Sequence, residues 1–442
     1  MLYAGVIFYL ALQFLRPQEF IEIIKGWRLV LSSMILLLPI WAVTLQWKKI
    51  LRTPVDLFCF AFYGACVLSW LNYWPMRMLG AGGPAVRVGK IFLGYLLVAH
   101  ALETRRKLVG GVWMIMLMLL LVGLLGHEIQ TGPTAGQYGS IGMFNNRNDF
   151  AYAMSMLIPV GLAFVLAAGP LGKVVGLGAF ILGSIQIYIT ESRGGALAAM
   201  AAAYAVLVTL PRSKVARTIL VVLGIAGVLI PFMFSKRLQS IGRYRRDKSV
   251  KGRLEIWSDC LTRFKRHPVI GHGAMTWQEL PDTPRDTHSS YMRVIVELGS
   301  LGLFAFVGML FYALRTSYKL SRAPPHPTVR VVALSMTGVI VGQIVGGLFQ
   351  TRVYYPFVYA ALGVASALAV VASREEGMLA EPTGRPEQPA DALSGLSPDL
   401  WERSRGAGFR APGLVRRKDL VWVGGLAFAC LLIYWRFLIF SF

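Results

Sequence analysis

Residues 253–302 of the chain read RLEIWSDCLTRFKRHPVIGHGAMTWQELPDTPRDTHSSYMRVIVELGSLG. This long polar segment lies between apolar stretches, and it contains three of the six histidines together with several arginines. It ends where His288 leads into a new run of apolar residues. If the apolar stretches on both sides cross a membrane, the segment lies at the membrane surface and carries much of the polar chemistry of the chain.

The composition is that of a membrane protein. Of 442 residues, 55% are hydrophobic and 15% are charged, whereas soluble domains carry about 25% charged residues. The mean hydropathy is +0.57. Apolar runs of about 20 residues recur along the chain, and each is long enough to cross about 30 Å of hydrocarbon as a helix. We therefore predict an all-α polytopic membrane protein.

Proline, glycine and clustered charge separate the predicted spans. These spans are 2–15, 29–46, 55–74, 84–102, 108–126, 149–168, 173–191, 194–211, 216–234, 291–314, 330–350, 356–372 and 420–440. The expected number is 12–13, because the first span is short and the seventh and eighth are separated only by the turn at 192–195. No cleavable signal peptide is expected, because residues 1–15 are apolar from the second position and lack a basic region and an A-x-A site.

Basic residues in the short loops predict the orientation. They all fall on one side of the membrane if the N-terminus starts there, and by the positive-inside rule that side is the cytoplasm. The residues are Lys48, Lys49, Arg52, Arg105, Arg106, Lys107, Lys173, Arg212, Lys214, Arg217, Arg315, Lys319, Arg322 and Arg330. The segment 253–302 then faces the periplasm of a Gram-negative cell, so the protein is expected in the inner membrane.

The domain organisation follows from these spans. We expect transmembrane helices 1–9 in residues 1–235, a large periplasmic loop at 236–290, and helices 10–12 in 291–372. Residues 373–419 are rich in Pro, Gly and charge, which predicts a cytoplasmic flexible linker. A further transmembrane helix is expected within 420–442.

The charge and the cysteines exclude several classes of partner. The net charge is +23, which would suggest nucleic acid in a soluble protein. Basic loops account for part of this charge in a membrane protein, so we expect membrane lipids and no nucleic acid as partners. The cysteines are Cys59, Cys66, Cys260 and Cys430. Three lie in spans and one is alone in its loop, so neither a disulfide framework nor a cysteine metal site is predicted.

Several common catalytic motifs are missing from the chain. There is no D-x-D, no H-E-x-x-H, no Cys/His cluster with metal spacing, and no P-loop or dinucleotide fingerprint. We therefore expect no cofactor and no metal. ATP-driven transport and metal-dependent glycosyl transfer are both disfavoured.

Arginine and histidine at the outer membrane boundary suit group transfer from a diphosphate. Arginine forks bind phosphate oxygens and stabilise the charge that develops on the leaving group. A histidine with a pKa near 6.5 can accept the proton of an attacking hydroxyl. His288 is the candidate base because it starts the tenth span. Each feature also has a plainer interpretation: His288 as a helix cap, Arg193 as a snorkelling partner of Glu191, and the long segment as a solvated loop.

The segment resembles a known family. His288-Ser289 followed by Gly299 and Gly302 is similar to the H-[NSQ]-x9-G-x-x-G signature of O-antigen ligases. Two upstream patterns resemble the large periplasmic loop of O-antigen ligases, O-antigen polymerases and bacterial protein O-oligosaccharyltransferases. These patterns are GR-x3-W (Gly252, Arg253, Trp257) and HP-x2-G-x-G (His267, Pro268, Gly271, Gly273). The GMFNNRNDFA and SRGG stretches also look like this superfamily, and the likeness covers residues 100–372.

The resemblance implies a GT-C-like fold and a metal-independent, inverting transfer on the periplasmic side. The donor would be undecaprenyl diphosphate carrying a glycan, and the acceptor in ligases is a sugar of the lipid A core. The family's essential histidine falls on His288, and one of its diphosphate-binding arginines falls on Arg193. The second, in the large loop, is placed on Arg253, with Arg266 and Arg285 as alternatives. Further candidates for substrate binding are Arg147, Arg266, Arg285, Asn145, Arg245 and Arg246.

Three functions remain open from the sequence. The first is an O-antigen ligase in lipopolysaccharide maturation. The second keeps the chemistry and changes the acceptor, as in a protein O-oligosaccharyltransferase or an O-antigen polymerase. The third is a transporter of lipid or polysaccharide, which would need polar residues in mid-span. The predicted spans contain few such residues, so the sequence favours an enzyme at the membrane surface.

Overall fold

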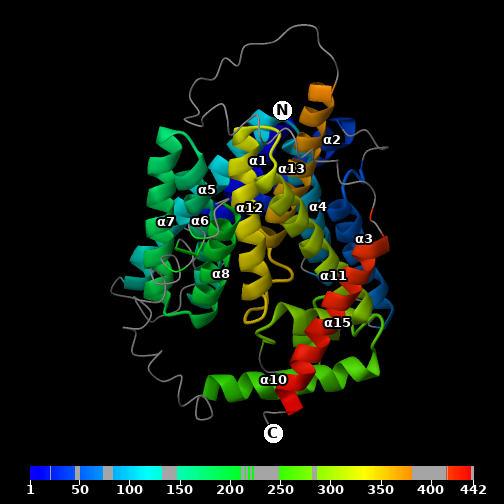
Figure 1. Ribbon diagram of the computed structural model, residues 1–442. Helices are drawn as coiled ribbons and strands as arrows, with labels where there is room; N and C mark the ends of the chain where they lie inside the picture. Colours follow the sequence, from blue (N-terminus) through cyan, green and yellow to red (C-terminus); the bar gives the residue numbers. More distant parts are fainter. Residues whose placement is uncertain are drawn as a thin grey trace.

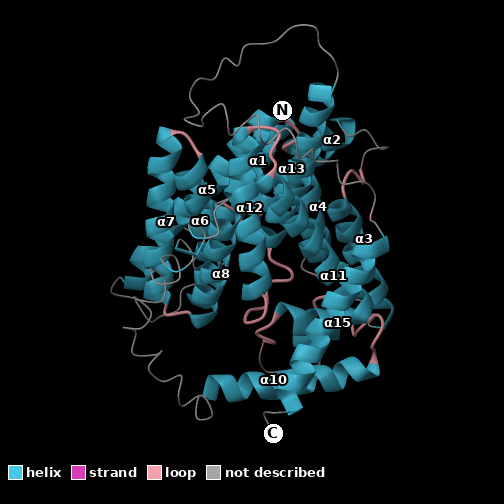
Figure 2. Cartoon of the chain, in the orientation of Figure 1, coloured by secondary structure: helices cyan, strands magenta, loops and turns pink. Residues whose placement is uncertain are grey.

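The computed structural model describes residues 1–19, 21–44, 50–72, 83–131, 147–210, 215, 218–219, 222, 248–280, 286–380, 415 and 417–439. Within these residues the chain forms helices joined by loops, and no strand is present (Figure 2). The long helices are α1 (Leu2–Leu15), α2 (Leu29–Thr44), α3 (Pro54–Ser69), α4 (Pro84–Ala101), α5 (Arg105–Thr131), α6 (Arg147–Ala167), α7 (Pro170–Thr190), α8 (Arg193–Thr209), α10 (Lys248–Arg266), α11 (Ser290–Arg322), α12 (Pro327–Gly346), α13 (Pro356–Ala380) and α15 (Arg417–Ile439).

The chain is an all-α polytopic membrane protein. In the described ranges, 7 helices are long and apolar enough to cross a membrane, and α1, α2 and α8 are shorter apolar helices. Each predicted span coincides with a described helix except 216–234, most of which lies outside the described residues. α11, α12 and α13 are among the most buried of the long helices, whereas α7 lies at the edge of the bundle (Figure 1).

Local sequence signals explain where the helices begin. Proline occupies the first turn of α3, α4, α7 and α12, where its missing N–H costs nothing. Thr53 caps α3 in a reciprocal capping box with Asp56. Ser192 accepts from the backbone N–H of Gly195 at the start of α8, and Ser289 accepts from that of Met292 at the start of α11.

The loops gather at two opposite ends of the bundle. At one end, Arg374 pairs with Glu103 at 3.5 Å and Arg322 donates to the carbonyl of Thr209 at 3.0 Å. This is the end of the predicted basic loops. At the other end, the first turn of α11 meets the loop between α12 and α13, and Ser290 N–H donates to the carbonyl of Gly347 at 2.8 Å. We call this second end the site end.

Two helices depart from the parallel bundle. α10 lies across the site end, nearly at right angles to the bundle helices, and α15 runs from the flank of α11 toward α10 (Figure 1). The predicted periplasmic loop thus contains a 19-residue amphipathic helix. The predicted linker also starts inside a helix, because α13 continues to Ala380. Its last turns are joined to the start of α5 by an ion pair between Arg105 and Glu375 at 3.7 Å.

Candidate functional site

His288 lies at the turn that leads into α11. Its φ is 50°, in the left-handed region, which costs an L residue about 1–2 kcal/mol. The residues on both sides of it are fully buried, and each is held by hydrogen bonds. The Thr287 carbonyl accepts from Trp257 Nε1 at 2.9 Å. Ser289 caps α11 and shares a hydrogen bond of 2.7 Å with the Tyr434 hydroxyl. These contacts hold the backbone on both sides of His288 and stabilise its strained conformation.

The loop between α12 and α13 is joined to the start of α11. Ser290 Oγ donates to the carbonyl of Gln350 at 2.8 Å and accepts from the backbone N–H of Arg352 at 2.8 Å. The hydroxyls of Thr287 and Thr351 lie 2.8 Å apart. The first turn after His288 and this loop therefore form one hydrogen-bonded unit.

A buried ion pair connects that unit to α6. The guanidinium of Arg352 bonds to Asp149 and to Gln350 Oε1, the latter at 3.1–3.2 Å, and lies 4.2 Å from the centroid of the Tyr355 ring. The Tyr355 hydroxyl donates to Asp149 Oδ2 at 3.0 Å. Burial raises the pKa of Tyr355 to about 12, so this donor keeps its proton. Asp149 is thus matched by a cation and a hydroxyl, as a buried carboxylate requires.

Four charged groups from different parts of the chain act on His288. Burial lowers its pKa from 6.5, and Arg253 of α10 and Arg352 lower it further, whereas Asp286 and Asp149 oppose the shift. The imidazole is therefore neutral at pH 7, which is the form that can accept a proton. Arg253 and His288 are close enough to interact, although the sequence separates them by a Pro-rich turn.

Arg193 starts α8 in the turn next to this cluster. A Cβ on the following residue, Gly194, would lie 3.1 Å from the Cβ of Phe349 and 3.7 Å from Gln350 Nε2. Arg193 is half-buried and has interactions with the surrounding protein. The SRGG turn thus lies against the same α12–α13 loop that bonds to the start of α11.

Arg147 and Arg266 interact with groups other than His288. Arg147 starts α6 and is 4.0 Å from Glu191, in an ion pair exposed to solvent. Arg266 is exposed at the last residue of α10. At 1.5 Å per residue it lies about 20 Å along the helix from Arg253, and it acts electrostatically on His272. The predicted residues Asn145, Arg245, Arg246 and Arg285 lie outside the described residues.

The HP-x2-G-x-G segment (His267 to Gly273) and the G-x-x-G segment (Gly299 to Gly302) contact each other backbone to backbone. We call this contact the joint. The backbone N–H groups of His272 and Gly273 donate to the carbonyls of Val296 and Glu297 at 2.9 Å, and Ser300 N–H donates to the carbonyl of Pro268 at 2.8 Å. Gly271 and Gly299 both have positive φ, and a Cβ on either would overlap the backbone of the other segment. The glycines are therefore required by close approach of two backbones.

Glu297 is the polar centre of this joint. It is fully buried, and its carboxylate accepts from the backbone N–H groups of Met275 and Trp277 at 2.9 and 3.0 Å. It also accepts from Tyr354 at 2.7 Å and from Arg293 at 3.1 Å. Every oxygen of the carboxylate is thus satisfied, and Glu297 stabilises the loop that precedes His288.

The sequence missed several of these residues. Asp149 lies within the GMFNNRNDFA stretch without a predicted role of its own, and Arg352, Tyr355, Gln350, Glu297 and Tyr434 are not among the predicted site residues. A signal existed for Arg352, because a lone arginine between two closely spaced apolar spans normally faces a partner or a cavity. No comparable signal marks Tyr434 as a neighbour of Ser289.

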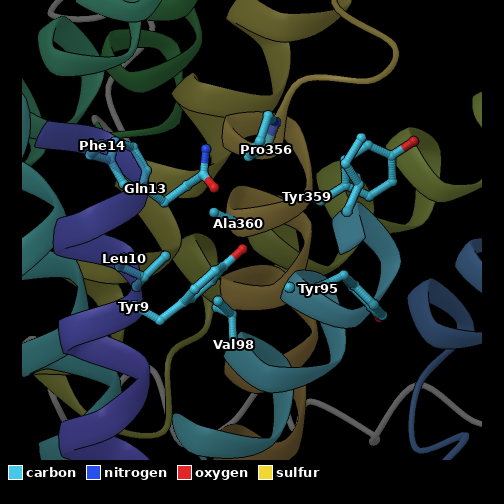
Figure 3. A pocket seen from close by; sticks show the side chains of 11 residues that line it. Tyr9, Leu10, Gln13, Phe14, Tyr95, Val98, Pro356, Tyr359 and Ala360 are labelled. Atoms are coloured by element: carbon cyan, nitrogen blue, oxygen red, sulfur yellow. The ribbon is translucent and has the colours of Figure 1, made fainter. Parts of the chain in front are cut away.

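Two pockets are found in the described part of the bundle. One pocket opens between α1, α4 and α13, with Tyr9 and Gln13 on one side and Tyr359 and Ala360 on the other (Figure 3). A second pocket has an apolar lining from α1, α5, α6, α12 and α13. Neither contains a predicted site residue. Among the described residues, no three His, Cys, Asp or Glu side chains gather as metal ligands would.

The fold and the site define a polytopic α-helical membrane protein with histidine and arginine gathered at one end of its bundle. Residues 178–307 match the family described as O-antigen ligase (Wzy_C). The chain is also similar to the exopolysaccharide production protein ExoQ of Rhizobium meliloti (strain 1021), with 21% identity over 305 residues, which cover 61% of this chain and 67% of that protein.

These similarities confirm the predicted resemblance to O-antigen ligase-like proteins. The family match includes Arg193, Arg253 and His288 together with both glycine motifs. They support a ligase- or polymerase-type function in a glycosyltransferase-like enzyme that uses lipid-linked polysaccharide.

Proposed function

We propose that this chain is a ligase that transfers polysaccharide from undecaprenyl diphosphate to a sugar hydroxyl of the lipid A core. The reaction would be metal-independent and inverting, on a GT-C-like scaffold, with the site end facing the periplasm and the protein in the inner membrane. The observation that carries the proposal is the position of His288. A half-buried imidazole with a lowered pKa stands beside Arg253 at one end of a membrane bundle.

His288 acts as general base in this proposal. The acceptor hydroxyl attacks the anomeric carbon of the donor sugar as the bond from that carbon to the diphosphate oxygen breaks, and the hydroxyl proton moves to the imidazole. A positioned base of this kind contributes about 10²–10⁴ in rate. The pKa of His288, lowered by burial and Arg253, keeps the base unprotonated before the acceptor arrives.

Arg253 and Arg193 bind the diphosphate in this proposal. Negative charge grows on the diphosphate as it leaves, and fixed guanidinium groups stabilise that charge without reorganising. Arg253 acts on His288 directly, and the turn of Arg193 lies against the α12–α13 loop. Arg352 is committed to Asp149 and is nearly inaccessible, so we assign it to the framework and not to substrate.

The test is transfer by purified protein in detergent, with a lipid-diphosphate-linked glycan, purified lipid A core, EDTA and no nucleotide. A ladder of glycan on the core lipid is the expected result. Product that depends on a nucleotide, or on a metal that EDTA removes, would contradict the mechanism. Glycan on an added protein acceptor would instead identify a protein O-oligosaccharyltransferase.

A polymerase is the second candidate, and one observation favours it. The relative ExoQ is named for exopolysaccharide production, and in a polymerase the acceptor is itself a lipid-linked glycan. The same assay separates the two reactions. Longer chains on the carrier in the absence of lipid A core would identify the polymerase.

A further inference from the structure

Two aromatic side chains hold the residues that flank His288. Trp257 of α10 donates to the carbonyl of Thr287 at 2.9 Å, and the Tyr434 hydroxyl of α15 lies 2.7 Å from Ser289 Oγ. The two rings contact each other edge to face, with centroids 5.0 Å apart and an interplanar angle of 89°. The residues before and after His288 are thus both held by one aromatic pair, Trp257 and Tyr434.

The C-terminal helix is docked firmly enough to carry such a contact. Tyr434 is buried, and its hydroxyl lies 3.5 Å from the carbonyl of Leu348 in the α12–α13 loop. Near its other end, Asp419 forms an ion pair with Arg315 of α11. α15 therefore follows α11 from Arg315 down to Ser289, in the arrangement seen in Figure 1.

We propose that α15 forms part of the active site and that Tyr434 is a positioning residue for His288. The proposal rests on the proposed function, in which His288 is the base. Tyr434 lies outside the residues that match the O-antigen ligase family, so the role belongs to this chain's own C-terminal helix. The Tyr434 hydroxyl anchors Ser289, and Ser289 fixes the turn that holds His288 in its left-handed conformation.

The aromatic pair also joins His288 to Arg253. Trp257 lies four residues after Arg253 on α10, so both side chains occupy the same face of that helix. Contact between the Trp257 and Tyr434 rings sets the position of α10 relative to α15. Tyr434 therefore affects both the direction of the base and its separation from the arginine.

Two substitutions that each remove one hydrogen bond test the proposal. Tyr434→Phe removes the bond to Ser289 and keeps the ring, whereas Trp257→Phe removes the bond to Thr287 and keeps an aromatic side chain. In full-length protein, diethyl pyrocarbonate should modify His288 several-fold faster in either variant, as measured by peptide mass spectrometry. We expect kcat for transfer to fall about tenfold, the effect of a loss equal to one hydrogen bond, with KM changed much less.

Tyr318→Phe is the matched control, because it deletes an exposed hydroxyl on α11 at the opposite end. It should leave both the modification rate and transfer at the wild-type value. Wild-type modification of His288 in Tyr434→Phe would overturn the proposal, whatever the activity of that variant. Faster modification with unchanged transfer would support the positioning role and contradict the proposed function, because His288 would then not be the base.

Discussion

Arg352 and Asp149 form a buried ion pair between positions 203 residues apart in the chain. The pair ties the first turn of α6 to the loop between α12 and α13, and that loop is bonded to Ser290 through the backbone N–H of Arg352. His288 lies two residues before Ser290. The ion pair of Arg352 and Asp149 therefore joins the first turn of α6 to the turn that carries the candidate base. No hydropathy pattern predicts this contact.

Breaking this pair should destabilise the fold. Arg352→Gln or Asp149→Asn leaves one buried charge without its partner, at a cost of about 3–5 kcal/mol. The double variant should cost less than the sum of the two, because neither charge then remains. Thermal unfolding in detergent, followed by size-exclusion chromatography, measures all three variants.

The pair of Arg374 and Glu103 provides the control for the ion-pair experiment. It is solvent-exposed at the opposite end of the bundle, so removing it should change stability by about 1 kcal/mol or less. Additive losses in the Arg352 and Asp149 cycle would mean that the two residues do not interact as the structure has them.

Replacing His288 should abolish transfer without preventing insertion. His288→Gln keeps a polar side chain of similar size and removes the base, so the rate should fall about 10²–10⁴-fold. Membrane yield and elution volume should match wild type. His326→Asn is the control, because His326 caps α12 through Thr328 and asparagine is also a good cap. Transfer by His288→Gln within a few-fold of wild type would remove His288 from the mechanism.

The sequence is a good guide to the membrane helices, for a physical reason. A helix that crosses hydrocarbon needs about 20 apolar residues wherever it stands in the bundle. Each membrane helix can therefore be recognised from its own stretch of sequence. Pro54, Pro84, Pro170 and Pro327 then mark the first turns. The predicted end of the helix at residue 372 is too early, because the charges of residues 373–380 suggested a linker. In the structure, Arg374 and Glu375 pair with residues near the start of α5.

The residues of the candidate site can be predicted only in part from local sequence patterns. His288 and the glycine motifs follow a local spacing, and the joint between Gly271 and Gly299 shows the reason for that spacing. Partners of His288 that come from elsewhere in the fold leave no such pattern. Asp149 and Arg352 are brought together by tertiary packing of α6 against α12, and the place of Tyr434 depends on how α15 docks.

Alanine at Gly271 or Gly299 should disrupt the joint before His288. Both positions have positive φ and no room for a Cβ against the backbone of the other segment. Backbone strain and atomic overlap together should therefore lower the free energy of unfolding by more than about 1–3 kcal/mol. Gly89→Ala is the matched control, because a Cβ there meets nothing within 4 Å. Its stability should be unchanged or slightly higher, since alanine favours a helix interior. Equal unfolding temperatures for all three variants would contradict the close approach.

The acid limb of the pH profile should report the charges around His288. The groups that act on it are Arg253, Arg352, Asp286 and Asp149. Since the neutral imidazole is the active form, kcat/KM should fall as the pH drops through the pKa of His288, below 6.5. Removing a positive neighbour raises that pKa, so Arg253→Gln should move the limb to higher pH.

Asp286→Asn should move the same limb to lower pH, because it removes a negative charge that favours the imidazolium. The asparagine oxygen can still accept from Thr287 N–H and Arg293, which Asp286 Oδ1 does in the structure. Each shift should be about one pH unit or less, as expected for charges that remain partly solvated. The position of the limb is compared and not its height, since Arg253→Gln also weakens diphosphate binding. Shifts of the same sign in both variants would mean that the limb belongs to a group other than His288.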